Sequence, residues 1–268
     1  MTRSRILGLA FALALVACKG EEATSTSAED IRGGEVARND PGIVMVHFAT
    51  GQFCSGTLVA PDRVLTAAHC LKYVADKVYV GVGVPTTPSD QVTSTRTMKP
   101  YPVAGQAQHP DYLPYVQRNG FDRCPVPVPD LAVVRLAQPI LDVTPVKLAA
   151  AMPKQGDVCR SIGFGAHRVG ADEYTYQEKR TARESISEIR ANAVKTRWVD
   201  GVSDKGDSGG ALVCGTELVG VTSCHDDDPD ARRYEIYARF DVAAAWLGTQ
   251  GVPLGAPTDG GAPIDAGR

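Results

Sequence analysis

The feature of this 268-residue chain that most restricts its fold is a series of short apolar runs separated by glycine, proline and aspartate. Runs of three to six residues are too short for most helices and are typical of strands that follow one another at close intervals. Their positions are 43–48, 56–59, 77–82, 131–136, 158–163, 211–213 and 218–221. The 27 glycines and 18 prolines, with only 6% aromatic residues, favour the same loop-rich structure. We therefore predict an all-β fold, either a barrel or a sandwich.

Helical periodicity is clearest near the C-terminus. Val242, Ala245 and Trp246 recur at helical spacing and share one face. Asp241 can cap the first turn and Gly248 can end the last. We predict a short C-terminal helix here, and residues 184–195 are also compatible with a helix.

The N-terminus has the pattern of an export signal. Two arginines precede twelve apolar residues at 6–17, a run too short to span a bilayer, so we interpret residues 1–17 as a signal peptide. The next residue completes the string LVAC at 15–18, which resembles the lipoprotein box of bacterial signal peptides. This resemblance implies cleavage before Cys18 and a lipid on its sulfur, which would anchor the protein to a bacterial membrane. An ordinary secretion signal that contains Cys18 is the alternative.

Two polar segments border the part of the chain that can fold. Residues 19–30 are polar and have few apolar side chains, and we interpret 18–30 as a flexible, lipidated tether. Residues 251–268 are rich in Gly, Pro, Ala and Asp, and we interpret them as a disordered tail. The folded domain is therefore predicted to be 31–250.

Charge and residue clustering exclude several classes of function. The formal net charge is −3, and no basic excess suggests a nucleic-acid partner. No CxxC string or His/Cys cluster indicates a metal, and the acidic run at 226–228 lacks the spacing of calcium ligands. We expect a monomer that needs neither a cofactor nor a metal.

Two strings carry candidate chemistry: TAAHC at 66–70 and GDSGG at 206–210. A serine hydroxyl is a poor nucleophile unless a base takes its proton and donors hold the charge that develops on the substrate. His69 offers the base, Ser208 the hydroxyl, and the glycines allow close approach of a substrate. Asp130 opens the apolar run PDLAVVRL between them. Taken singly, each has a plainer interpretation: a surface turn, a buried structural histidine and the end of a strand.

Together, in this order, the strings resemble the trypsin/chymotrypsin family of serine proteases. The segment FCSGTLV at 53–59 and the strands that follow Ser208 resemble the same family, so the resemblance covers about residues 31–247. It implies two six-stranded antiparallel β-barrels, divided near residues 140–150, with the site at their interface. It also implies hydrolysis of peptide bonds in protein or peptide substrates through an acyl-enzyme intermediate.

The resemblance assigns a role to each candidate residue. Ser208 would be the nucleophile, His69 the base, and Asp130 the acid that orients His69. The backbone N–H groups of Gly206 and Ser208 would form the oxyanion hole. Ser223 would hydrogen-bond to Asp130.

The cysteines fit an exported protein. Apart from Cys18 there are six, enough for three disulfides in an oxidising compartment. The pairs that the resemblance implies are Cys54–Cys70 and Cys159–Cys214. Cys124 and Cys224 remain, and we predict a bridge between them across the substrate cleft. Two free buried thiols are the alternative.

The substrate pocket departs from the family pattern. Val202 stands where trypsin-like enzymes have an acid, and Asp204 replaces a cysteine of the usual pocket disulfide. Counting from Ser223, Glu235 replaces a pocket-wall glycine, and its carboxylate could pair with a substrate Arg or Lys. We therefore predict a preference for a basic residue before the scissile bond. The alternative partners for Glu235 are Arg232, Arg233 and Lys205.

The segment DIRGG at 30–34 resembles the family's activation site. Cleavage between Asp30 and Ile31 would free an amine that pairs with Asp207 and orders the oxyanion hole. The same cut would release the enzyme from the lipid on Cys18, so we expect it in the cell envelope, in the medium, or in both. The competing hypothesis is a non-catalytic binding lipoprotein on the same scaffold.

Overall fold

The computed structural model describes residues 34–87, 92–119, 128–168, 174–201, 203, 205–225 and 234–254. Several sequence predictions lie outside these residues: the signal peptide, Cys18, the tether, Ile31, Cys124, Val202, and the tail beyond residue 254. No helix within the described ranges is both long and apolar enough to cross a membrane.

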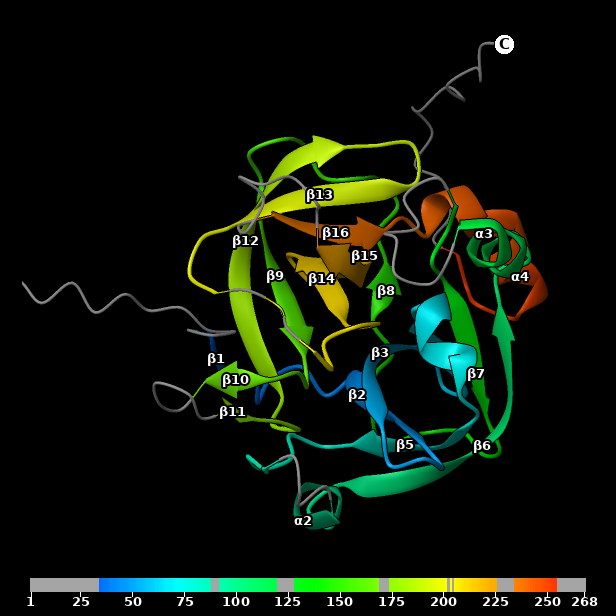
Figure 1. Ribbon diagram of the computed structural model, residues 1–268, viewed down its shortest axis with the longest axis vertical. Helices are drawn as coiled ribbons and strands as arrows, with labels where there is room; N and C mark the ends of the chain where they lie inside the picture. The colour runs from blue at the N-terminus through cyan, green and yellow to red at the C-terminus, as the bar shows by residue number, and fades with distance from the viewer. Residues whose placement is uncertain are drawn as a thin grey trace, which may run out of the picture.

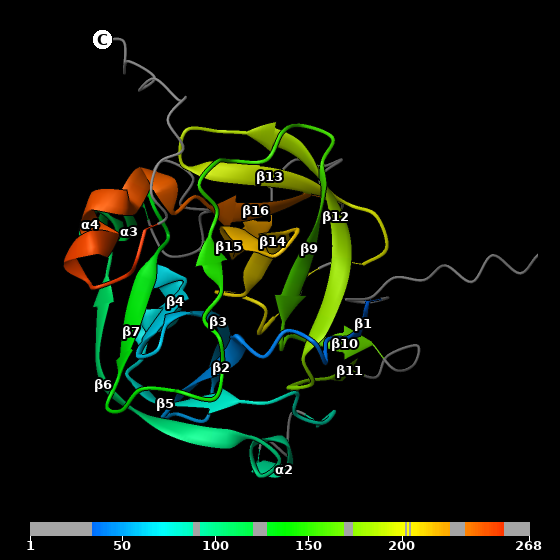
Figure 2. The same ribbon diagram turned by 180° about the vertical axis from the view of Figure 1, so that it is seen from behind.

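The chain folds into two closed six-stranded antiparallel β-barrels, as the resemblance implied (Figure 1). Around the first barrel the strands are β2 (Ile43–Phe48), β3 (Phe53–Ala60), β4 (Arg63–Thr66), β7 (Ala132–Leu136), β6 (Lys99–Gln108) and β5 (Ala75–Val80). Around the second they are β9 (Val158–Gly163), β12 (Arg180–Ile189), β13 (Ala193–Trp198), β16 (Tyr234–Ala238), β15 (Glu217–His225) and β14 (Ala211–Cys214). Figure 2 shows the same two barrels from behind, one above the other.

Short elements complete the two barrels. The strands β1 (Glu35–Val36) and β8 (Lys147–Leu148) pair with β12 and β15, and β10 (His167–Arg168) pairs with β11 (Tyr174–Thr175). The helices are η1 (Ala68–Lys72), α2 (Val92–Thr95), α3 (Tyr112–Asn119), η2 (Asp241–Ala243) and α4 (Ala244–Thr249).

The predicted C-terminal helix is confirmed, but its ends differ from the prediction. It starts as the 3-10 turn η2, and no side chain caps it. The Asp241 carboxylate instead accepts two hydrogen bonds from Arg239, at 3.0 and 2.6 Å. Gly248 lies inside α4, which continues to Thr249.

The helical interpretation of residues 184–195 is wrong, because this segment forms the hairpin of β12 and β13. Ala182, Glu184 and Ile186 are buried at every second position of β12, the period of a strand. A buried glutamate among apolar inward positions hid that alternation from the sequence analysis.

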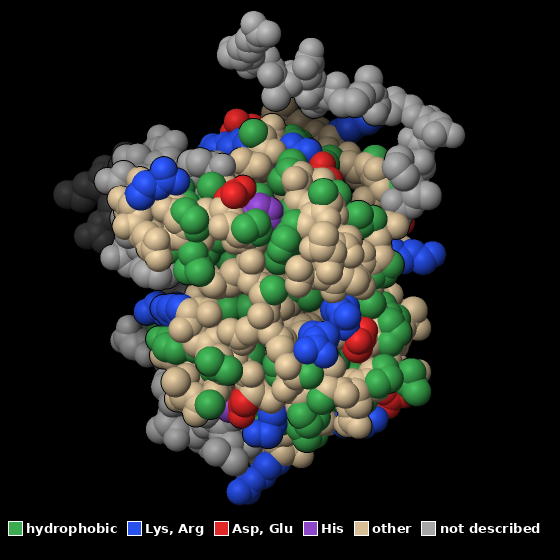
Figure 3. Space-filling model, turned by 90° about the vertical axis from the view of Figure 1, so that its right-hand side faces the viewer, with side chains coloured by type: hydrophobic (Ala, Val, Ile, Leu, Met, Phe, Trp, Pro, Cys, Tyr) green, Lys and Arg blue, Asp and Glu red, His purple; other side chains and the backbone are tan. Residues whose placement is uncertain are grey.

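The barrel interiors differ in composition. The main apolar core fills the first barrel and continues between the two, whereas a smaller cluster around Ile186, Val194 and Leu212 fills the second. On the face drawn in Figure 3, charged and apolar side chains are interspersed in small groups.

Candidate active site

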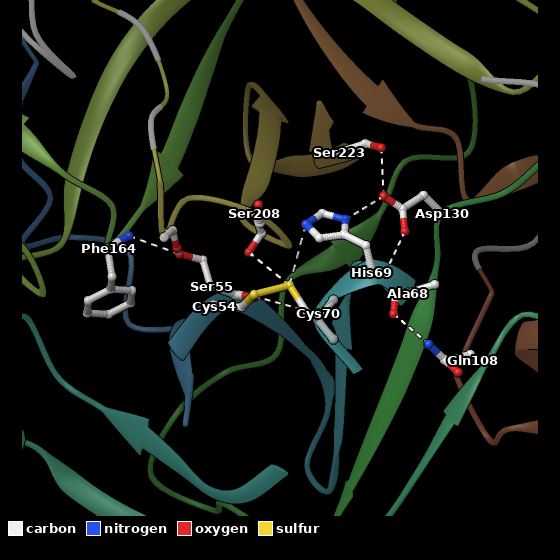
Figure 4. The surroundings of a disulfide bond; sticks show 12 residues. Cys54, Ser55, Ala68, His69, Cys70, Gln108, Asp130, Phe164, Ser208 and Ser223 are labelled. Carbon is white, nitrogen blue, oxygen red and sulfur yellow. Dashed lines mark hydrogen bonds and ion pairs between the residues drawn. A yellow bond between two sulfur atoms is a disulfide. The ribbon is translucent and has the colours of Figure 1, made fainter. Parts of the chain in front are cut away.

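His69 is placed by the tight turn that follows β4. Ala67 and Ala68 are completely buried, and the Ala68 carbonyl accepts a hydrogen bond from Gln108 Nε2 at 2.7 Å. The backbone N–H of His69 donates to Asp130 Oδ1 at 2.9 Å, and its Nδ1 lies 2.7 Å from Asp130 Oδ2 (Figure 4). The carboxylate therefore holds both the backbone and the ring of His69.

Asp130 stands just before β7 with 1% of its surface exposed. Ser223 Oγ donates to its Oδ2 at 2.7 Å, as the sequence analysis expected. Burial raises the pKa of Asp130, but the charge and hydrogen bonds of His69 and the bond from Ser223 outweigh burial and lower it overall. The carboxylate is therefore ionised and accepts the proton of Nδ1, which leaves the lone pair of the neutral imidazole on Nε2.

The pKa of His69 is raised overall. Burial lowers it most strongly among single causes, but the charge of Asp130 and its hydrogen bond together exceed that effect. The ring is thus prepared to accept a proton at Nε2 and to be stabilised as an imidazolium.

Ser208 lies in the turn between residue 205 and β14. It lines a pocket of about 400 Å³ together with His69 and Gly206, and Figure 4 shows it on the side of the ring opposite Asp130. Among the described residues, no hydrogen bond joins the Ser208 hydroxyl to Nε2. Such contacts are often long without substrate and shorten in the complex.

The orientation of two amide groups near Ser208 follows from hydrogen bonds to the carbonyls of the same peptides. In a planar trans peptide the N–H points away from the C=O. Ala166 N–H binds the Lys205 carbonyl at 2.9 Å, and Gly210 N–H binds the Asp207 carbonyl at 2.7 Å.

The N–H groups that share these peptides belong to Gly206 and Ser208. Within the described part of the chain, neither donates to a protein acceptor. Both residues line the pocket, so their N–H groups are available to an oxygen bound there. Gly206 has φ = +101°, a conformation that favours glycine.

Ser55, on β3 of the first barrel, hydrogen-bonds to the turn that carries Gly206 and Ser208. Its buried hydroxyl donates to the Gly206 carbonyl at 2.9 Å and accepts from Phe164 N–H at 2.9 Å. Its backbone N–H donates to the Ser208 carbonyl at 2.8 Å. The sequence analysis did not single out Ser55. Its one signal was its place beside Cys54 in the string FCSGTLV.

Asp207 points away from the pocket toward the loop after β9. Its side chain is buried, and Gly165 N–H donates to Oδ1 at 2.8 Å. A Cβ added to Gly163 or Gly165 would lie 2.2 Å from a carboxylate oxygen, so the loop accommodates the carboxylate only with glycine there. The partner that the sequence analysis expected, Ile31, is outside the described residues.

The disulfides Cys54–Cys70 and Cys159–Cys214 are both formed. The first joins β3 to η1 beside His69 (Figure 4), and the second joins β9 to β14. Cys224 is also disulfide-bonded, whereas its expected partner Cys124 is outside the described residues.

Of the candidate specificity residues, Glu235 is buried and lies close to a second buried glutamate, Glu184. Glu235 is 1% exposed, and its Oε2 lies 3.0 Å from Nδ1 of His225, a partner that the sequence analysis did not consider. Glu184, also missed, accepts hydrogen bonds from Thr196 Oγ1 and from the Tyr237 hydroxyl, the latter at 2.8 Å. Burial and the charge of Glu235 raise the pKa of Glu184 to about 7. An acid at an inward position of a strand was the signal that could have identified it.

The described residues contain no group of three or more His, Cys, Asp or Glu side chains placed to hold a metal ion. What the site does contain is a base held by an acid, a hydroxyl on the other side of the base, and two residues of one pocket whose N–H groups donate to no described protein acceptor. These are the parts that acyl transfer requires.

Comparisons with known proteins agree with this geometry. The Trypsin family profile matches residues 31–247. The chain is 30% identical over 233 residues to a trypsin from Saccharopolyspora erythraea, covering 78% of this chain and 92% of the relative. It is 29% identical to kallikrein 1-related peptidase b3 of Mus musculus, covering 78% and 84%. The solved structure of mouse neuropsin shares the fold, with a TM-score of 0.64, 24% identity, and coverage of 83% and 99%. The chain belongs to the trypsin family.

Proposed function

We propose that the protein is a serine endopeptidase. The observation that carries the proposal is the hydrogen-bonded row from Ser223 through Asp130 to His69, which ends at a pocket lined by Ser208 and Gly206. Family membership supports the same reaction class.

The reaction proceeds in two halves. His69 Nε2 takes the proton of Ser208 Oγ while that oxygen bonds to the substrate carbonyl carbon, and the carbonyl oxygen becomes an oxyanion. The N–H groups of Gly206 and Ser208 donate to that oxygen. His69 then gives the proton to the leaving amine as the C–N bond breaks, which leaves an ester on Ser208. In the second half, water replaces the amine, and the ester is hydrolysed to a carboxylic acid and the free hydroxyl.

A fluorophosphonate probe tests this proposal, because it phosphonylates only an activated serine. The wild-type protein should be labelled at Ser208, and Ser208→Ala should abolish labelling without a change in the urea midpoint. Ser187→Ala, a distant serine on β12, is the matched control and should label normally. A folded wild-type protein that resists the probe and cleaves no peptide would instead indicate a binding protein on this scaffold.

We also propose a preference for arginine or lysine before the scissile bond, with Glu235 and Glu184 supplying the acidic environment. The contact between His225 Nδ1 and the Glu235 carboxylate would have to open, or the carboxylate would have to be shared with the substrate. A peptide library varied at that position tests the preference, and Glu235→Gln should reduce it. Equal rates for arginine and leucine substrates would reject it.

Export and activation complete the proposal. Two disulfides support an oxidising compartment. We propose that cleavage at Asp30–Ile31 both activates the enzyme, through an ion pair of Ile31 with Asp207, and releases it from a lipid on Cys18. N-terminal sequencing and mass analysis of the active form test both steps. Active enzyme with an unbroken, acylated N-terminus would contradict them.

A further inference from the structure

The lining of the pocket beside Ser208 includes basic side chains but no acidic ones among the described residues, and the proposed reaction does not explain this. Phe48, Phe53 and Tyr73 make much of its wall apolar, and two lysines, Lys72 and Lys205, line it from opposite barrels. No aspartate or glutamate occurs among the described residues of its lining. A bound peptide would therefore meet two ammonium groups and no carboxylate among these lining residues.

The pocket lies on the side of the His69 ring that faces away from Asp130 and Ser223. It is bounded by the Cys54–Cys70 disulfide, whereas Ser223 lies on the other side of the His69 ring (Figure 4). Under the proposed function, the residue before the scissile bond binds on the side of Ser223 and Glu235. A peptide that crosses Ser208 then continues into the pocket with the residues that leave as the amine product.

Lys72 is well placed to act on those residues. It ends η1, three positions after His69, and its exposed ammonium lies 5.2 Å from the centre of the Tyr73 ring. It forms no ion pair with any described residue. Burial and Asp130 have the larger effects on the pKa of His69, and the charge of Lys72 also lowers it, so its field reaches the reacting groups.

Lys205 brings a second ammonium from the other barrel. It directly precedes Gly206, its side chain is exposed, and it lines the same pocket. The two lysines therefore flank the path of the leaving peptide, one from η1 and one from the turn that carries Ser208.

We propose that this pocket selects substrates with an aspartate or glutamate at the second or third position after the scissile bond. The proposal rests on the endopeptidase function and specifies its substrate class. The apolar wall accepts the residue next to the scissile bond, and a carboxylate beyond it pairs with Lys72 or Lys205. Because such pairs are exposed to solvent, each should change the rate only modestly.

The test uses fluorogenic peptides that are identical up to the scissile bond and carry Glu, Gln or Lys at the second position after it, with a parallel set at the third. We expect kcat/KM to fall roughly 3- to 10-fold from Glu to Lys in at least one set, and this ratio to shrink at high salt. Lys72→Gln and Lys205→Gln should each reduce the ratio, and the double variant should abolish it. Lys147→Gln, the same change on β8 outside the pocket, is the control and should leave it unchanged.

A second measurement separates charge from packing. Lys72→Gln should move the acid limb of the kcat/KM profile to higher pH, since removing a positive charge raises the pKa of His69. Cleavage without any Glu-over-Lys preference, or a preference that survives the double variant, would overturn the inference alone. No cleavage of any peptide and no probe labelling would overturn the endopeptidase function as well.

Discussion

The most informative perturbation of this molecule is Ser55→Ala, because it removes one oxygen atom that connects the first barrel to the turn carrying Gly206 and Ser208. The substitution removes the hydrogen-bond partner of the buried Phe164 N–H and of the C=O of Gly206, a half-buried residue that lines the pocket. An unsatisfied buried group costs about 1–3 kcal/mol, so the loss at Phe164 alone should lower the free energy of unfolding by about 1–3 kcal/mol. The space left by one oxygen is smaller than a water molecule needs, so water cannot replace the bond to the buried Phe164 N–H.

The same variant should slow catalysis. The Gly206 carbonyl would no longer be fixed, so the turn could rotate and carry the neighbouring N–H groups away from the substrate oxygen. Loss of one oxyanion donor costs about 10²–10³-fold in rate, which sets the upper range for this indirect effect. The loss should appear in kcat with little change in KM, because these donors bind the transition state more strongly than the substrate.

The assay combines urea unfolding with steady-state hydrolysis of an ester and a peptide substrate. Thr57→Val is the matched control: Thr57 is buried two positions along the same strand, and its hydroxyl has no hydrogen-bond partner among the described residues. It should keep full activity and equal or higher stability. If Ser55→Ala kept the wild-type kcat and urea midpoint, the hydroxyl of Ser55 would not be what fixes the turn that carries Ser208. A loss of stability at full kcat would limit the role of that hydroxyl to docking of the barrels.

Three further perturbations test other parts of the site. Asp130→Asn should lower turnover by about 10⁴-fold, since an amide stabilises the wrong tautomer of His69. It should also shift the acid limb of the kcat/KM profile to lower pH, because the charge of Asp130 raises the pKa of His69. Unchanged turnover would remove Asp130 from the mechanism. Gly165→Ala would place a Cβ 2.2 Å from a carboxylate oxygen of Asp207, so probe labelling should slow strongly and the free energy of unfolding should fall by about 1–3 kcal/mol. Unchanged labelling and stability would show that the loop shifts without cost. Glu184→Gln should flatten the pH dependence of stability: with its pKa raised to about 7, folded Glu184 keeps a proton that the unfolded chain releases near 4.5. Wild-type stability should therefore fall by up to about 3 kcal/mol, relative to the variant, as pH rises through that window; parallel unfolding curves for the two proteins would contradict the shift.

The overall architecture could be predicted from the sequence. Short apolar runs with turn residues between them specify strands, and the ordered strings around His69, Asp130 and Ser208 resembled a family whose fold has two barrels. The error at residues 184–195 has a physical cause. Glu184 occupies an inward position because Tyr237 and Thr196, both distant in sequence, satisfy its carboxylate inside the second barrel. A local pattern carries no information about such partners.

The same reasoning explains why the support of the site was missed. The strings TAAHC and GDSGG show which groups can react, but they do not show what holds them. Ser55 contacts Gly206 across 151 positions of sequence and Phe164 across 109. The partner of Glu235 was likewise unpredictable, since His225 becomes its neighbour only through the register of β15 against β16.

The distribution of the site over two barrels determines how its function depends on folding. The first barrel supplies His69 and Asp130, whereas the second supplies the turn with Ser208 and the hydroxyl of Ser223. The bond from Ser223 to Asp130 and the contacts of Ser55 with that turn all cross the interface.

Neither barrel alone therefore orients the base or fixes the amides. We expect activity to be lost at lower urea than the barrel secondary structure, because separation of the barrels breaks these few bonds before either sheet opens. The two losses can be followed in parallel by probe labelling and circular dichroism. Coincident transitions would instead mean that each barrel is stable only while docked to the other.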